Sequence, residues 1–126
     1  MTQSRFEITK AASFEAAHYL NDGPIDSRYR RLHGHSFRVE ATLRGEADAT
    51  SGWVADLAAL DAALREFANE LDHGLLNDKP GLETPTLERL CLYFAERLSP
   101  RFPSLARLAV SRPTLSETCV LDLSGG

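Results

Sequence analysis

The sequence has few of the residues that mark disulfide-bonded, thiolate-metal or nucleic-acid-binding proteins. Its two cysteines, Cys91 and Cys119, lie far apart and form no CxxC pair, so we expect two buried thiols and neither a disulfide framework nor a thiolate zinc site. Lys and Arg number 14 against 18 Asp and Glu, so no broad basic surface for a nucleic acid is expected. No window approaches the roughly 18 apolar residues of a membrane helix, and no apolar signal-peptide core is present. These absences predict a cytoplasmic protein with neither a nucleic-acid nor a membrane partner.

The composition is typical of a globular protein. With 126 residues, 43% hydrophobic and 25% charged, the chain is expected to form a single domain over residues 1–126. Because the net charge is −4, any anionic ligand must be held by a local cluster of cations.

Strand patterns occupy both ends of the chain. The first predicts a long strand with a bulge around Ala11 and Ala12, and the second alternates cleanly between apolar and polar residues. The predicted strands are Arg5–Ala17, His35–Arg44, Leu105–Arg112 and Thr118–Leu123. Between the first two lies an exposed loop, residues 21–31, whose length is typical of functional loops.

A helical period of about 3.6 residues replaces the strand pattern after Gly52. It predicts one helix over residues 57–71 capped by Asp56, and a second over residues 85–98, with Thr84 as its cap and Pro85 in its first turn. Two strands, two helices and two strands indicate an α+β fold (ββααββ), a four-stranded antiparallel sheet with both helices on one face.

Three of the four histidines form a pattern suited to a metal. His33 and His35 stand at alternate positions where a strand begins, so both imidazoles point to one side. His18 ends the preceding strand and would lie beside them if the two strands pair. Three imidazoles without a thiolate are typical of a catalytic zinc site with one open position. The alternative is a polar strand entry without a metal.

The fourth histidine, His73, follows Asp72 at the end of the first predicted helix. A neighbouring carboxylate can orient an imidazole and favour its protonated form, as acid–base catalysis requires. The alternative is that His73 only interacts with the negative end of the helix dipole.

Together these features resemble the 6-pyruvoyl-tetrahydropterin synthases and the bacterial 6-carboxytetrahydropterin synthases. The matching segments are Phe14-Glu-Ala-Ala-His18, Leu32-His-Gly-His35, Gly52-Trp-Val-Ala-Asp56, Leu71-Asp-His73 with Leu76-Asn77, and Pro85-Thr86-Leu-Glu88. They span roughly residues 5–123 in the family's order. The resemblance implies the T-fold, in which the sheets of several subunits join into a barrel, commonly a homohexamer built from two trimers with sites between subunits.

The resemblance also implies a Zn²⁺ held by His18, His33 and His35, and 7,8-dihydroneopterin triphosphate as substrate. His73 would be the proton donor, Asp72 its orienting partner, and Thr86 a substrate-binding residue. The product would carry a pyruvoyl group if the carbon chain survives. It would carry a 6-carboxyl group if acetaldehyde is lost, as in bacterial queuosine biosynthesis.

One departure from the family concerns the catalytic base. The family's cysteine stands four residues before the first histidine of the HGH motif, and Tyr29 occupies that position here. A phenol, with an ordinary pKa of about 10, is a poor base near neutrality unless the zinc or neighbouring arginines lower that pKa. Asp26 is an alternative base from the same loop.

The second departure concerns the glutamate that anchors the pterin ring in this family. Spacing from the chain end places Arg112 at that position, whereas the only Glu-Thr pair is Glu117-Thr118. A guanidinium cannot accept hydrogen bonds from a pterin's donor edge, so Arg112 would favour a different ligand. Glu117 would retain the usual contact.

A third feature is the basic end of the loop, where Arg28, Arg30 and Arg31 lie close in sequence. Their forked donors would suit the triphosphate. The alternative is a solvated loop or ion pairs with a neighbouring subunit. Two functions therefore stay open: a lyase with a base other than cysteine, or a zinc-containing pterin- or purine-binding protein that has lost the usual reaction.

Overall fold

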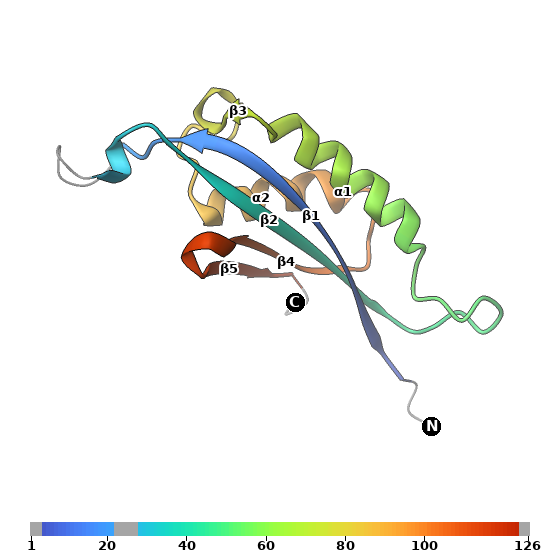
Figure 1. Ribbon diagram of the computed structural model, residues 1–126. Coiled ribbons are helices and arrows are strands. Elements are labelled where there is room, and N and C mark those ends of the chain that lie inside the picture. The colour runs from blue at the N-terminus through green and yellow to red at the C-terminus, as the bar shows by residue number, and fades with distance from the viewer. Residues whose placement is uncertain (1–3, 22–27, 124–126) are drawn as a thin grey trace.

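The computed structural model of the protein describes residues 4–21 and 28–123. Its dominant feature is a long, twisted antiparallel pair of strands, with both α-helices on one side of the sheet (Figure 1). The elements are β1 (Phe6–His18), η1 (Arg28–Arg30), β2 (His33–Gly45), α1 (Leu57–Leu71), β3 (Gly74–Leu75), η2 (Leu76–Asp78), α2 (Leu87–Leu98), β4 (Leu105–Arg112), η3 (Pro113–Leu115) and β5 (Glu117–Asp122).

The sheet is mixed and has five strands in the order β3-β1-β2-β4-β5. The predicted four strands are present and antiparallel, but β3 adds a fifth that runs parallel to β1. A strand of two residues cannot display an alternating pattern, so β3 was not predicted. Its pairing with Ala16 and Ala17 places the segment that follows α1 beside the C-terminal end of β1.

The β1–β2 register is continuous, from Phe6 opposite Gly45 to His18 opposite His33. The bulge predicted near Ala11 and Ala12 is therefore wrong. Two consecutive alanines blur the alternation in the sequence, yet they fit the regular ladder. The irregularity lies instead where β2 meets β4, between Thr42 and Leu43. An unbroken register carries the inward-facing positions of β1 directly to His18.

The helix caps agree with the sequence in one case and differ in the other. Asp56 caps α1 as predicted, its Oδ1 accepting the Ala58 N–H at 2.9 Å. The prediction of Thr84 for α2 is wrong, because Thr86 is the cap and its Oγ1 accepts the Arg89 N–H at 3.1 Å. Pro85 therefore lies before the helix, which leaves its carbonyl group for another partner.

The core fills the space between the sheet and the two helices. Phe14 stacks on Phe37 with ring centroids 5.1 Å apart, and Phe94 of α2 lies 6.0 Å from Phe14. The predicted buried thiol of Cys91 is 1% exposed, whereas Cys119 is only partly buried. No helix within residues 4–21 and 28–123 has the length and apolarity needed to cross a membrane.

Candidate functional site

Three histidines from β1 and β2 converge at one end of the sheet. The ring centroids of His18, His33 and His35 are 4.6 to 5.0 Å apart, and one nitrogen from each ring lies within 4.8 Å of the others. The cluster forms because His18 pairs with His33 across the ladder and His35 stands two residues further along β2. Phe37 packs against the rings of both His18 and His35, with centroids 5.9 and 5.7 Å away.

Two backbone carbonyl groups orient these rings. His18 Nδ1 lies 3.0 Å from the Pro85 oxygen, and His33 Nδ1 lies 2.6 Å from the Arg31 oxygen. A carbonyl only accepts, so each Nδ1 carries the hydrogen and each Nε2 carries a lone pair. The two Nε2 atoms nevertheless face each other at 3.0 Å. Two acceptors this close repel unless a cation lies between them.

The surroundings of His18 and His35 favour the uncharged form of both imidazoles. The pKa of His18 is lowered to about 4, chiefly by burial and to a smaller extent by the positive charges of neighbouring groups, while the hydrogen bond to Pro85 opposes the shift. Burial also lowers the pKa of His35, assisted by the charge of Arg112. The Nε2 of His35 is buried and has no hydrogen-bond partner among the described residues.

These observations are consistent with a metal centre. Neutral imidazoles are the form that binds metals, and His18 and His33 each give the other ring N–H to a carbonyl, as metal-binding histidines usually do. The three histidines could hold a metal ion, and a set of three nitrogens leaves a coordination position open.

A cavity of roughly 660 Å³ opens beside the cluster. Its walls bring several of the sequence candidates together with the imidazoles. The candidates that line it with His33 and His35 are Arg28, Tyr29, Arg112 and Glu117, and Arg31 joins them. Arg30 and Thr86 are not part of its lining.

Arg112 and Glu117 face each other across the β4–β5 ladder inside this cavity. The Arg112 Nε atom lies 2.9 Å from Glu117 Oε1, yet it is buried without a hydrogen-bond partner in the described part of the chain. The N–H of this atom therefore does not point at the carboxylate, and the contact is an ion pair without a directed hydrogen bond. Ser116, with φ of 55°, makes the tight return that brings them together.

The Asp72–His73 pair lies at the other edge of β1. His73 Nδ1 donates to Asp72 Oδ2 at 2.7 Å, while Asp72 Oδ1 accepts the Glu15 N–H at 2.8 Å. The Glu15 N–H and the His73 hydrogen bond lower the pKa of Asp72, so the carboxylate stays charged beside the ring. His73 itself has a φ of 60° and its side chain is 80% exposed. Its Nε2 is thus directed to the outside.

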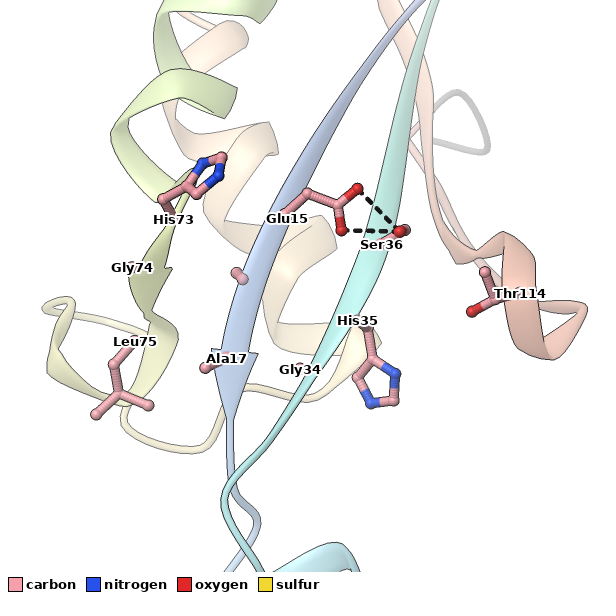
Figure 2. Close-up of a pocket in the computed structure, with 10 residues that line it drawn as sticks. Glu15, Ala17, Gly34, His35, Ser36, His73, Gly74, Leu75 and Thr114 are labelled. Carbon is pink, nitrogen blue, oxygen red and sulfur yellow. Dashed lines mark hydrogen bonds between the residues drawn. The ribbon is translucent and has the colours of Figure 1, made fainter.

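A second cavity, of roughly 690 Å³, includes both His73 and His35 in its lining. Figure 2 shows these two rings on opposite sides of the β1–β2 pair, with Glu15 and Ser36 between them. The Ser36 hydroxyl donates to the Glu15 carboxylate, at 2.7 Å from Oε2. One chain therefore does not place its own His73 ring beside its own imidazole cluster.

Comparison with known proteins identifies the family. The sequence profile described as 6-pyruvoyl tetrahydropterin synthase matches residues 7–122. The chain belongs to this family. It is 41% identical over 96 residues to the 6-carboxy-5,6,7,8-tetrahydropterin synthase of Synechocystis, covering 72% of this chain and 73% of the relative. It is 33% identical over 101 residues to the dihydroneopterin monophosphate aldolase of Pyrococcus furiosus, covering 80% and 82%.

Solved structures of the 6-pyruvoyl tetrahydropterin synthase family share the fold. The Caenorhabditis elegans enzyme superposes with a TM-score of 0.85 at 25% identity, over 97% of this chain and 98% of its own. That of Plasmodium vivax gives 0.71 at 19% identity, over 94% and 98%. The expected T-fold is thus confirmed, as a mixed five-stranded sheet with two helices.

The remaining candidate residues from the sequence take different positions. Tyr29, at the place of the family's cysteine, lies in η1 and is 58% exposed at the cavity. Arg30 is in the same 3₁₀ turn, and Thr86 serves as the cap of α2. Asp26 lies outside the described residues.

Sequence reasoning missed the groups that hold the histidines. The carbonyls of Pro85 and Arg31 carry no sequence signal, because every residue has a carbonyl. Asn77 was part of a matching segment, and its side chain binds the backbone next to His18. In the sequence, the position of Asn77 shortly after Asp72 and His73 was the sign that could have indicated its role.

Proposed function

We propose that this chain is a zinc-dependent 6-carboxy-5,6,7,8-tetrahydropterin synthase-like lyase that converts 7,8-dihydroneopterin triphosphate in the cytoplasm, in queuosine biosynthesis. The observation that carries the proposal is the imidazole cluster, in which two Nε2 lone pairs face each other at 3.0 Å. Identity of 41% to a 6-carboxy-5,6,7,8-tetrahydropterin synthase supports the choice of reaction.

His18, His33 and His35 would hold the Zn²⁺. When bound, the ion would act as a Lewis acid and stabilise negative charge as a proton leaves the substrate's side chain. The chain's own contribution is to keep His18 and His35 uncharged, by burial, and to orient His18 and His33 through the carbonyls of Pro85 and Arg31. The ring of Phe37 packs against His18 and His35 and covers the side of these rings that faces the core.

The cations of the 660 Å³ cavity would hold the phosphate groups. Arg28 and Arg31 are among the residues that line it, and both are exposed. Guanidinium groups donate paired hydrogen bonds to phosphate oxygens, so they would bind the triphosphate and orient the side chain toward the histidines. Arg30, from the same turn, would contribute charge from outside the lining.

His73 would move a proton at its Nε2 atom. Asp72 fixes the tautomer by accepting the Nδ1 hydrogen, which leaves Nε2 as the atom that exchanges the proton. Because His73 lies across β1 and β2 from the cluster of its own chain, we infer that a neighbouring copy supplies it (Figure 2). A homohexamer of two trimers, with sites between subunits, would satisfy this requirement.

Tyr29 is our candidate for the base in place of the cysteine, because it reaches the same cavity as His33 and His35. A second candidate function follows from the same residue. If the phenol cannot remove the proton, the protein would bind a pterin or a purine without turnover, and the retained Asp72–His73 pair argues against this reading.

The test is to incubate the zinc-loaded protein with 7,8-dihydroneopterin triphosphate and identify products by mass spectrometry. A 6-carboxytetrahydropterin with release of acetaldehyde is expected. A pyruvoyl product would move the chain to the sister reaction, and a product shortened by aldol cleavage would align it with the aldolase relative. Tight binding without turnover would establish the binding protein. A Tyr29→Phe variant that keeps full activity would remove the phenol from the mechanism.

A further inference from the structure

The inner wall of the 660 Å³ cavity carries a donor and an acceptor side by side. Arg112 ends β4 and Glu117 begins β5, and the two are direct partners across the ladder. The Arg112 side chain is only 16% exposed, its Nε atom is buried, and it lies 2.9 Å from Glu117 Oε1. Glu117, at 47% exposed, is accessible to a ligand in the same cavity.

The chemistry of this pair restricts what can bind against it. A guanidinium only donates hydrogen bonds and a carboxylate only accepts them. An edge with two adjacent donors would pair with Glu117 but would oppose the N–H groups of Arg112. A carboxylate or phosphate would pair with Arg112 but would be repelled by Glu117. A ring edge with a carbonyl next to an N–H, that is, a cyclic lactam, satisfies both.

We propose that Arg112 and Glu117 are specificity-determining residues that together bind the lactam edge of a fused pyrimidinone ring. Arg112 donates to the ring carbonyl and Glu117 accepts from the adjacent ring N–H. The group at position 2 of the ring then lies outside the pair, so the protein tolerates an oxo group there as well as an amino group. This inference rests on the proposed function, because it takes a pteridine as the occupant of the cavity.

A matched pair of ligands tests this directly. 6-Hydroxymethylpterin and 6-hydroxymethyllumazine share the lactam edge and the side chain, and differ only in the amino or oxo group at position 2. Binding of each to the zinc-loaded protein is measured by calorimetry. We expect the two dissociation constants to agree within about threefold, because neither ligand leaves a polar group of the pair unpaired. Preference for the pterin by more than about tenfold, the effect of one hydrogen bond to a charged group, would overturn the inference.

The Arg112→Met variant should change this selectivity. With the guanidinium gone, Glu117 alone favours an edge with two donors, so the pterin should bind about tenfold more tightly than the lumazine. Arg107→Met, on the same strand but paired with Glu7 at the surface, is the control and should keep the equal affinities. An Arg112→Met protein that folds and still binds both ligands equally would contradict the assignment.

The ratio of the two dissociation constants in the wild type tests the inference even if Arg112→Met does not fold, because that measurement requires no substitution. Failure of the proposed function is distinguishable: if the zinc-loaded protein binds neither pteridine, the cavity does not take this ligand class and both proposals fall. If it binds the pterin strongly and the lumazine weakly, only the present inference falls.

Discussion

The side-chain amide of Asn77 binds both the backbone N–H and the backbone carbonyl of Tyr19. The Asn77 Oδ1 atom accepts the Tyr19 N–H at 3.0 Å, and its Nδ2 donates to the Tyr19 carbonyl at 2.9 Å. The amide side chain thus imitates a strand partner at the point where β1 ends, one residue after His18. The position of a candidate metal ligand therefore depends on a residue of η2.

Asn77→Ala should weaken the metal site from a distance. Both backbone groups of Tyr19 would lose their partner, and we expect a loss of about 1–3 kcal/mol in the free energy of unfolding. The apparent affinity for zinc should fall by about 10-fold, in the range seen for groups that orient ligands. Denaturant unfolding and competition with a chelator measure the two effects. Asn69→Ala, exposed on α1, is the control and should change neither.

Each of His18, His33 and His35 should be required for metal binding, whereas His73 should not. We expect about one zinc per chain in the wild type, by analogy with other three-histidine sites. Replacing any of the three by Ala should abolish stoichiometric zinc in elemental analysis. His73→Ala should retain it, because that ring lies across the β1–β2 pair. Removal of zinc by a chelator should lower the Tm, since only the folded chain presents the three nitrogens together.

Asp72 should make stability depend on pH in the acid range. Its pKa in the folded protein is lowered by the Glu15 N–H and by His73, from an ordinary value of 3.8. A lowered pKa means that the carboxylate contributes stability above the unfolded value, and that this contribution is lost as the pH falls through the folded pKa. Asp72→Ala should therefore be less stable than the wild type at pH 7. The difference should narrow below about pH 3.8, as followed by urea unfolding at each pH. A gap that stays constant down to pH 2 would contradict this role.

The two threonines before α2 should differ in their effect on stability. Thr86→Ala removes the hydrogen bond to the Arg89 N–H and should cost about 1 kcal/mol. Thr84→Ala removes an exposed side chain outside the helix and should stay within about 0.5 kcal/mol of the wild type. Thermal or chemical unfolding measures both. Equal losses would show that the cap does not stabilise the helix.

Much of the fold could be predicted because long, regular elements carry strong patterns. The alternation that ends in Leu43 and the leucine stripe of α1 each required one face to be buried, and the structure buries those faces. Local features, such as the residue that caps a helix, were harder to predict. Thr84 and Thr86 are equally suitable caps in sequence, and only the placement of Pro85 outside the helix distinguishes them.

The parts of the site that consist of chemically distinctive side chains could be predicted from the sequence. Histidines at the end of one strand and the start of the next converge once the strands pair, and the sequence showed both ends. The ring orientation depends on the carbonyls of Pro85 and Arg31, which no side chain reveals. Arg112 and Glu117 were alternatives in sequence because the path of the turn was unknown. The left-handed Ser116 makes them partners.

One segment of β1 connects the two halves of the proposed chemistry. The backbone of Glu15 binds both Asp72 and His73 on one edge of the strand, and His18 follows three residues later in the imidazole cluster. A shift of this strand would displace the proton carrier and a metal ligand together. In an assembly where each chain gives its His73 to a neighbour's cluster, such a shift would alter two sites at once, so adjacent sites would sense each other's occupancy through a single strand.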